Sequence, residues 1–425
     1  MPSYTYNLGS KKHVFIDWAI VEPGYGNWPE TEDAHIQNTS NPSSRFASRE
    51  DEGAGGWELS YGLRLRAHNP RVDLQPIVYP DKPWETEGQR GIVAYSSLLE
   101  DEGRFRLYYG CHDASLGDDS ADEVDPATFV LAYAESTDGI NWIKPRIGTV
   151  EFDGSTDNNL VYGMEMSLNR FLLEATVFKD PSAPPDERYK LIHGGLLNKK
   201  PCVYGAVSPD GLKWNPIVEP LLPDYQSDTQ SVARFDEEKG KYVGYFRSWS
   251  GSERGKWHGR RTIAYAETDR FDRWPIPQEI VAPDMHDSPD TDLYSISYTP
   301  WPESDAHLMF PGLFEHRLDV VEVHMMTSRD GLKWQRPTRK PILPTGEPGH
   351  ALERSVYGGV GLVNINPGEY SLPISPRGRS HNQAWKNITY SDPKDRGYLC
   401  LATWRKDGFM SLEVETQGGF TTVPL

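Results

Sequence analysis

The sequence lacks the features that define several large classes of protein. Its 425 residues include three cysteines that are far apart in the chain and give neither a disulfide framework nor a zinc pattern, so we expect buried thiols (Cys111, Cys202, Cys400). No apolar run approaches the roughly 20 residues of a membrane span. The first residues lack the charged start and apolar core of a signal peptide. These absences predict no membrane partner and a cytoplasmic location, or a secreted one if a signal segment has been removed.

Positive charge is also scarce. Lys and Arg number 44 against 62 Asp and Glu, which gives a net charge of −18. Such a surface repels nucleic acid, so we expect no nucleic-acid partner. It suits a neutral or cationic small molecule or a bound structural Ca²⁺, and no other cofactor is expected. The acidic run at 118–125 is more simply explained as a solvated face, whereas the run at 284–292 also precedes a strand.

Several catalytic motifs are missing as well. The chain has no His-Glu-x-x-His, no Gly-x-Ser-x-Gly and no Cys-x-x-Cys. The glycines at 358–361 are not followed by a helical pattern, which argues against a phosphate-binding loop. The sequence therefore predicts no zinc peptidase, no serine hydrolase of the elbow type and no dedicated metal site.

What the sequence does contain is an internal repeat. The stretch Ser136-Thr-Asp-Gly-Ile-Asn-Trp142 returns at 208–214 and at 328–334, with a looser copy at 267–274. The aspartates of successive copies are 72, 59 and 61 residues apart. Each copy is typical of a tight turn, in which the Asp caps its own backbone and the Gly takes the left-handed conformation. The Trp that ends the copy is then expected to pack back on the sheet.

The repeat predicts the architecture. An apolar, Tyr-rich run precedes each copy, as at 129–134 and 262–266. The spacing suits one four-stranded sheet per copy, somewhat longer than the roughly 40–50 residues of the common propeller repeats. Runs typical of strands form five such groups after residue 61, and a sixth would need strands hidden in residues 1–60. The sequence thus predicts an all-β, five-bladed β-propeller that forms a single domain over 1–425.

The first 60 residues are irregular apart from one apolar run. We expect the run at 13–21 to close the ring by pairing with the last blade, and residues 22–60 to form a long loop. With the insertions at 112–127 and 250–259, that loop is expected to shape the rim of a pocket on the propeller axis.

Acidic residues recur at the ends of the inner strands, which line the axis of a propeller. Glu85 precedes the first blade, Asp180 follows the inner strand of the second, and Asp228 precedes the third. Asp292 and Glu353 precede the last two blades. Any one of these acids alone is more simply a turn cap or a channel ion pair. Their recurrence at similar positions predicts carboxylates that converge on one site.

Converging carboxylates are what glycosidic cleavage requires, because one must donate a proton while another attacks the sugar or activates water. A third can orient the sugar and raise the pKa of the acid. On position, we assign Asp228 as the general acid, Glu85 as the base or nucleophile, and Asp180 as the sugar orienter and pKa modulator. Further substrate contacts are predicted from the acids, aromatic rings and cations near strand ends (Asp17, Trp84, Trp249, Trp257, Asp292, His316, Glu353, Arg354).

Two short motifs resemble those of a known enzyme family. The stretch 177–181, Val-Phe-Lys-Asp-Pro, followed by 188–192, resembles the Arg-Asp-Pro element of the five-bladed glycoside hydrolases of family 32, which has relatives in families 43, 68, 117 and 130. The resemblance implies that Asp180 orients the sugar and stabilises the transition state. It also implies that the segments around Asp228 and Glu85 correspond to the general acid and to the N-terminal Asp of that family. Asp228 replaces a Glu and Glu85 replaces an Asp, so mechanism and stereochemistry do not carry over.

A broader pattern resembles a group of bacterial propeller proteins that are similar to glycoside hydrolases. It comprises Asp17 in Ile-Asp-Trp-x-Ile, Pro-Trp-Glu at 83–85, the first repeat, Asp-Gly-Ser-Thr-Asp-Asn-Asn at 153–159, and Arg-Lys-Asp-Gly-Phe at 405–409. This match spans most of the chain. It implies a carbohydrate as the small-molecule partner and leaves the oligomeric state open.

Three functions are compatible with these residues. The first is a glycosidase that acts on a small oligosaccharide or furanoside. The second is a carbohydrate-binding propeller of the lectin type, which needs aromatic and amide groups on the axis and not three carboxylates. The third is a sialidase-like enzyme, which needs three converging arginines and a Tyr nucleophile, for which the chain offers Arg260, Arg261, Arg317 and Arg354.

Overall fold

The computed structural model describes residues 9–21, 61–113, 129–163, 173–198, 200–251, 259–347, 352–382, 390, 393–420 and 422. Within these ranges the chain is built almost entirely of antiparallel strands, so the predicted all-β class is confirmed. The helical elements there are one turn of α-helix and two 3₁₀ turns, α1 (Pro83–Thr86), η2 (Pro185–Glu187) and η3 (Pro393–Arg396). In the described ranges, none of these is long and apolar enough to cross a membrane.

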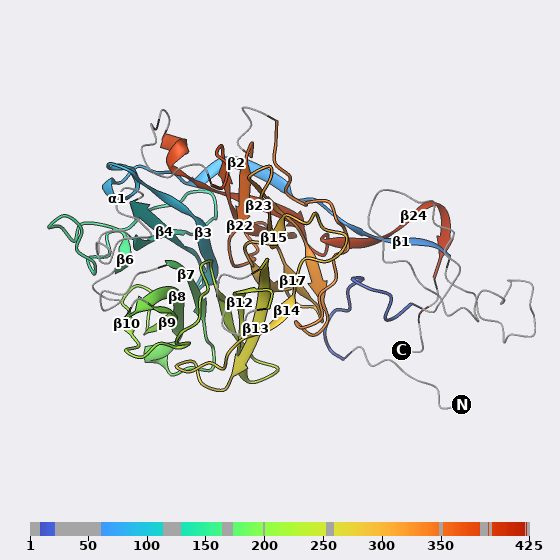
Figure 1. Ribbon diagram of the computed structural model, residues 1–425, viewed down its shortest axis with the longest axis horizontal. Coiled ribbons are helices and arrows are strands. Elements are labelled where there is room, and N and C mark those ends of the chain that lie inside the picture. The colour runs from blue at the N-terminus through green and yellow to red at the C-terminus, as the bar shows by residue number, and fades with distance from the viewer. Residues whose placement is uncertain are drawn as a thin grey trace, which may run out of the picture.

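Three sheets have four strands each, and in each the strands follow one another in chain order from the inner to the outer edge. The first contains β3 (Arg90–Asp101), β4 (Arg104–Asp113), β5 (Phe129–Ser136) and β6 (Leu160–Gly163). The second contains β7 (Leu173–Lys179), β8 (Tyr189–Leu197), β9 (Lys200–Ser208) and β10 (Asn215–Pro216). The third contains β11 (Val232–Asp236), β12 (Lys241–Trp249), β13 (Arg261–Thr268) and β14 (Gln278–Val281). Figure 1 shows these sheets as blades set around a common centre.

The rest of the ring is one seven-stranded sheet in the order β15 (Thr291–Leu293), β18 (Gly312–Glu315), β19 (Val320–Val323), β21 (Ser355–Gly358), β22 (Glu369–Arg377), β23 (Leu399–Arg405) and β2 (Arg71–Val78). A three-stranded sheet continues its first three strands, with β16 (Tyr298–Pro300), β17 (His307–Met309) and β20 (Met326–Ser328). The described strands therefore form a β-propeller of four blades, not the five predicted. The predicted fourth and fifth units are joined by a parallel pair, Val321 with Ser355.

The closing strand also differs from the prediction. β2 pairs with β23 and completes the outer edge of the last sheet, so a strand from the N-terminal part of the chain does close the ring. The run at 13–21, which was expected in this role, forms no strand. It packs Val14 and Ile16 against the core near Trp301 instead. β1 (Tyr61–Ala67) and β24 (Met410–Gly419) form a two-stranded ribbon that extends away from the blades in Figure 1.

The repeated turns share one set of hydrogen bonds. The Ser hydroxyl accepts from the Gly N–H three residues later, at 2.8 Å for Gly139 and 2.9 Å for Gly211 and Gly331. The Asp carboxylate accepts from the next two N–H groups along the turn, for example those of Ile140 and Asn141. Each Gly has a φ between 72° and 75°, where a side chain would be strained. The sequence Ser-x-Asp-Gly thus encodes the exit from the third strand of a blade.

The inner strands contact one another directly near the axis. The Gln230 amide donates to the carbonyl oxygens of Ser96 and Ala175, both at 3.1 Å, which ties the first three blades together. At the seam between the last sheet and the first, Val360 N–H donates to the Ser96 carbonyl and Leu98 N–H donates to the Val360 carbonyl, both at 2.8 Å. A Cβ at Gly361 would overlap the Leu98 carbonyl oxygen, so this close approach requires glycine.

Candidate active site

Ionisable side chains from several strands of the ring gather near its axis. Tyr95 comes from β3, Tyr294 follows β15, and Tyr357 comes from β21, with ring centroids 5.9 Å apart for Tyr95 and Tyr357 and 6.2 Å apart for Tyr294 and Tyr357. Glu174 of β7 and Arg247 of β12 are close enough to influence the ionisation of these rings. Burial, followed by the charge of Glu174, raises the pKa of Tyr95 well above its usual value. The three four-stranded sheets and the seven-stranded sheet therefore all contribute to this cluster, which we call the axial cluster.

Glu174 is the most unusual member of the axial cluster. Its φ is 50°, in the left-handed region that residues other than glycine rarely adopt. Its Oε2 atom is buried and has no hydrogen-bond partner among the described residues. Burial raises the pKa of Glu174 well above its ordinary value, and the nearby charge of Asp228 adds to that rise, while Arg247 opposes it. A carboxyl group in this setting is held in its neutral form, and such strain and burial are typical of functional positions.

Asp228 lies near Glu174 and is paired with a cation. Its Oδ1 accepts a hydrogen bond from Arg247 Nη1 at 2.5 Å, and the Asp228 side chain is 22% exposed. Arg247 is 1% exposed and also donates to the backbone carbonyls of Asp228 and Tyr294. Its guanidinium carbon lies 4.3 Å from the Tyr294 ring centroid. A fixed, buried cation thus holds one oxygen of the Asp228 carboxylate, and the exposed part of the side chain remains open to a ligand.

A second polar group borders the axial cluster. Asp292 Oδ2 accepts from Arg261 Nη1 at 2.6 Å and lies 2.8 Å from His316 Nε2. Arg261 reaches back to the cluster, with its guanidinium carbon 5.3 Å from the Tyr294 ring centroid. On another side, His381 Nδ1 lies 2.8 Å from the Tyr357 hydroxyl. Burial, followed by the charge of Arg247, lowers the pKa of His381 to about 4, which favours the neutral ring at neutral pH.

Glu85 does not join the axial cluster. It lies in α1, where its carboxylate accepts from the N–H groups of Asp81 and Lys82 and from the Tyr109 hydroxyl. Lys144 Nζ lies 2.7 Å from Glu85 Oε2. The side chain is fully buried and surrounded by donors. Glu85 is therefore a structural link between α1 and the first sheet, where the sequence predicted a base or nucleophile.

Asp180 also lies elsewhere, because it follows the far end of β7. Six residues separate it from Glu174, which corresponds to about 20 Å along a strand. Its carboxylate accepts from the Ser182 N–H and hydroxyl and from the Tyr242 hydroxyl, the last at 2.5 Å. Glu85, Asp180 and Asp228 thus share no hydrogen-bond partner in the described part of the structure, which does not bring the three together: in the Lys-Asp-Pro turn at this strand end the carboxylate serves as a cap.

The other predicted contacts divide between the cluster and the periphery. Asp292, His316 and Trp249 border the axial cluster, Trp249 through its contact with Arg261. Asp17 pairs with Arg329 instead, and Glu353 pairs with Arg354. Trp84 packs against Phe152 on the first sheet. Trp257 and the acidic run at 118–125 lie outside the described residues, as do almost all of the predicted rim segments 22–60, 112–127 and 250–259.

The acidic stretch at 284–292, considered above for Ca²⁺, is already paired with cations. Asp284 and Asp287 contact Arg339, and Asp292 contacts Arg261. In the described ranges, no three His, Cys, Asp or Glu residues gather closely enough to hold a metal ion.

Sequence reasoning missed Glu174 and Arg247, the two residues that give the axial cluster its character. Both stand within otherwise apolar strands, Leu-Glu-Ala-Thr-Val-Phe and Tyr-Val-Gly-Tyr-Phe-Arg-Ser-Trp. A charged residue inside such a run was the available signal. The prediction rested on acids before and after the strands, and these two residues lie within them.

Comparison with known proteins supports the fold. No protein-family model and no curated protein sequence matches the chain. A solved structure described as a glycoside hydrolase has a TM-score of 0.52 at 11% identity, with 79% of this chain and 92% of that chain covered. An N-acetylgalactosamine deacetylase from F. plautii, in complex with blood group B trisaccharide, has a TM-score of 0.51 at 12% identity, with 80% and 94% covered.

The chain therefore has the fold of the β-propeller glycoside hydrolases, as its motifs implied. At this level of identity the likeness concerns the fold alone. The second of these structures is a deacetylase, so the fold by itself does not decide the reaction, and the chemistry has to be argued from the axial cluster.

Proposed function

We propose that this protein is a glycoside hydrolase that cleaves a small carbohydrate at the axial cluster by acid–base catalysis. The observation that carries the proposal is the pair Glu174 and Asp228. Burial raises the pKa of the Glu174 carboxyl, while the Arg247 cation lies against Asp228. A buried carboxyl group with a raised pKa beside a carboxylate that is paired with a cation is the arrangement that glycosidic cleavage uses.

The catalytic roles of Glu174 and Asp228 follow from these environments. Glu174, neutral at the start, donates its proton to the glycosidic oxygen as the bond from that oxygen to the sugar carbon breaks. Asp228, ionised, either attacks the sugar carbon or takes a proton from the attacking water. Glu174 therefore takes the acid role that the sequence gave to Asp228, and Asp228 takes the role given to Glu85. A separation of about 5–5.5 Å between the two carboxyl groups in the substrate complex means retention, and about 6.5–9.5 Å means inversion.

The surrounding groups suit a sugar. Tyr95, Tyr294 and Tyr357 offer ring faces and hydroxyls, and His316, whose side chain is 46% exposed, offers a ring nitrogen near Asp292. The Arg247 and Arg261 charges are each matched by a carboxylate. The described part of the cluster thus favours a neutral carbohydrate. The proposed reaction needs no metal.

The alternative functions have less support. A lectin-like propeller has no use for a buried carboxyl group on a strained residue, because such a group costs stability without adding affinity for a neutral sugar. In the sialidase-like hypothesis, Arg260 is engaged with backbone carbonyls and Arg354 with Glu353, so the two do not share a ligand site. Burial raises the pKa of Tyr294, the ring nearest two arginines, to about 12, which disfavours a phenolate nucleophile.

The test is a panel of aryl glycosides with the purified protein, followed by analysis of the products. We expect one or more glycosides to be cleaved, and both Glu174→Gln and Asp228→Asn to lose most of that activity. Asp272→Asn is the matched control. Asp272 is an exposed carboxylate that pairs with Arg270 and contacts no described residue of the axial cluster. Release of acetate from N-acetylated sugars without glycosidic cleavage would replace the hydrolase proposal with a deacetylase.

A further inference from the structure

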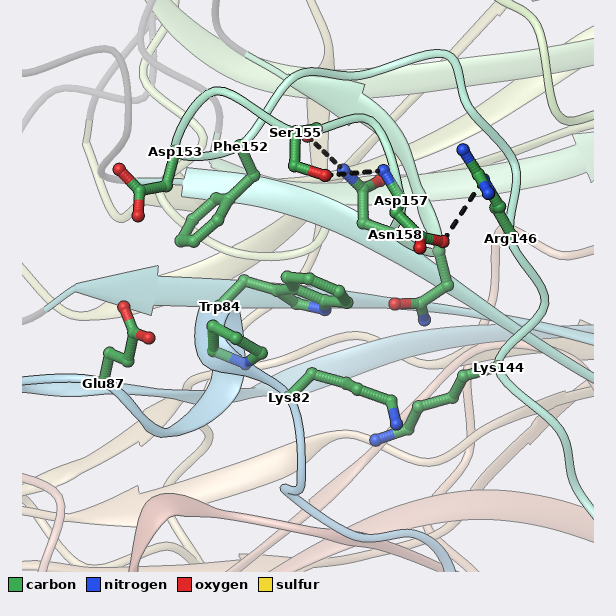
Figure 2. A pocket seen from close by; sticks show the side chains of 12 residues that line it. Lys82, Trp84, Glu87, Lys144, Arg146, Phe152, Asp153, Ser155, Asp157 and Asn158 are labelled. Carbon is green, nitrogen blue, oxygen red and sulfur yellow. Dashed lines mark hydrogen bonds and ion pairs between the residues drawn. The ribbon is translucent and has the colours of Figure 1, made fainter.

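A second pocket lies on the first sheet, apart from the axial cluster. It encloses about 440 Å³, within the range of small-molecule sites. Its walls come from α1 and from the segment between β5 and β6, and it shares no residue with the axial cluster (Lys82, Pro83, Trp84, Glu87, Lys144, Arg146, Phe152, Asp153, Ser155, Asp157, Asn158, Asn159). Figure 2 shows Phe152 and Ser155 on one side of this pocket, Lys82 and Lys144 on the other, and the Trp84 ring between them. We call it the blade-one pocket.

The wall formed by residues 150–159 is fixed before any ligand binds. Phe152 and Ser155 exchange two backbone hydrogen bonds, at 2.9 and 3.1 Å. Asp153 closes that turn with a φ of 48°, a conformation unusual outside glycine. The Asn158 amide donates to the carbonyl oxygens of Val150 and Ser155. A loop held in this way loses little conformational entropy on binding, which favours affinity.

The floor of the pocket combines an aromatic surface with polar atoms that lack partners. Trp84 and Phe152 pack edge to face, with centroids 5.7 Å apart. Trp84 Nε1 and Asn159 Oδ1 are buried and have no hydrogen-bond partner among the described residues. The Asn159 amide cannot be reversed, because its Nδ2 donates to the Tyr133 carbonyl at 2.6 Å and contacts the Tyr109 hydroxyl at 3.0 Å. Oδ1 is therefore an acceptor of fixed position, and the indole N–H is a donor.

The cations around the pocket are already paired. Three cations and three carboxylates line it, and each cation already has an anionic partner: Lys82 with Asp81, Lys144 with Glu85, and Arg146 with Asp157. An anionic ligand would have to compete with these pairs. A neutral ligand with hydroxyl groups would not, because hydroxyls both accept and donate and so suit the Trp84 N–H and the Asn159 oxygen. An apolar sugar face also matches an aromatic ring.

We propose that the blade-one pocket is a second carbohydrate-binding site, which takes one or two neutral sugar rings independently of the axial reaction. The ligand would rest on Trp84 and Phe152 and hydrogen-bond to Asn159. Binding there requires no catalysis, so the proposal stands or falls separately from the glycosidase assignment. Its effect would be to hold an oligosaccharide on the side of the propeller while another part of that chain, or another chain, reaches the axis.

The experiment uses the full chain with the Asp228→Asn substitution, which prevents turnover, on an array of neutral oligosaccharides. The best-bound oligosaccharide is then titrated by calorimetry. Ser155→Trp places a large side chain at an exposed wall position and should weaken binding at least tenfold. Thr156→Trp, an exposed neighbour that does not line the pocket, is the matched control and should change binding less than twofold.

Asn159→Ala gives a second, smaller perturbation and should weaken binding about tenfold, provided that the thermal midpoint shows a folded protein. The proposal is overturned if no neutral oligosaccharide binds with a Kd below about 10 mM, which is weaker than specific binding. It is also overturned if Ser155→Trp binds as well as Thr156→Trp, since the ligand would then occupy the axial cluster alone. Loss of glycosidase activity in these variants is not a criterion, so failure here leaves the axial proposal untouched.

Discussion

Glu174→Gln tests the proposed mechanism most directly. The change keeps the shape of the side chain and removes the proton that the acid must donate. General acid catalysis contributes about 10²–10⁴ in rate, which is about 3–5 kcal/mol of barrier. We expect a loss of that size for a glycoside with a poor leaving group, and a much smaller loss for an activated aryl glycoside, whose leaving group needs no proton.

The pH dependence gives a second measure of the same change. Because burial raises the pKa of Glu174, the wild-type enzyme should keep its acid protonated to a pH well above that of an ordinary glutamate. Its kcat/KM should then fall at alkaline pH, as Glu174 loses its proton. In Glu174→Gln nothing titrates at this position, so the alkaline fall should disappear. The assay is kcat/KM for both substrates from acid to alkaline pH, with thermal melts at each point to exclude unfolding.

Two results would refute this reasoning. Equal rate losses on the poor and the activated leaving group would mean that Glu174 does not donate the proton. An alkaline limb that persists unchanged in Glu174→Gln would assign that limb to another residue. In either case the strained conformation of Glu174 would need a structural explanation.

Three further predictions concern stability. Asp180→Asn should lower the free energy of unfolding by about 1–3 kcal/mol, because the amide cannot accept from both Ser182 and Tyr242 as the carboxylate does, and should leave kcat unchanged. Trp214→Ala should cost about 3–5 kcal/mol in denaturant unfolding, because this ring is 4% exposed between the first two sheets. Glu174→Gln should become more stable relative to wild type as pH rises above about 4.3. Above that pH Glu174 ionises in the unfolded wild-type chain but not in the folded one, so the wild type loses stability and the Gln variant does not.

Each of these three predictions would be contradicted by a specific result. A drop in kcat of a hundredfold in a stable Asp180→Asn protein would restore the catalytic role that the sequence suggested. A loss below about 1 kcal/mol for Trp214→Ala would contradict its buried position. For Glu174→Gln, a stability difference from wild type that does not change between pH 4 and pH 8 would mean that the folded carboxyl ionises as freely as the unfolded one.

The repeated turns made much of the fold predictable. Ser-x-Asp-Gly fixes its own backbone through short-range hydrogen bonds, so this four-residue motif predicts where the third strand of a blade ends. The number of blades was harder to predict. The last two units are joined by the pairing of Val321 with Ser355, and no local sequence pattern indicates that pairing. The closing strand was misplaced for a similar reason: 13–21 is more apolar than β2, and its apolar side chains serve packing and not pairing.

The site was predicted less well than the fold. Asp228, which precedes an inner strand, does lie beside Glu174 and Arg247 in the axial cluster, and its catalytic role stays a prediction. The same rule failed for Asp180, because a carboxylate after the strand lies at the opposite end of the blade. It failed for Glu85 because a four-residue helix intervenes before β3. Which end of a strand faces a ligand is a property of the whole ring, so it cannot be read from one blade.

The seam near Gly361 has a consequence for biosynthesis. Residues 96 and 98 meet residue 360 there, across more than 260 positions of chain. At about 5–20 residues per second, the ribosome needs roughly 13–50 seconds to deliver the second side of the seam after the first. During that interval the inner edge of β3 has unpaired backbone groups, which are open to wrong partners. A slow-growing ring of this kind should depend on chaperones more than its final stability suggests, and pulse-labelled chains stalled before residue 360 would show that dependence directly.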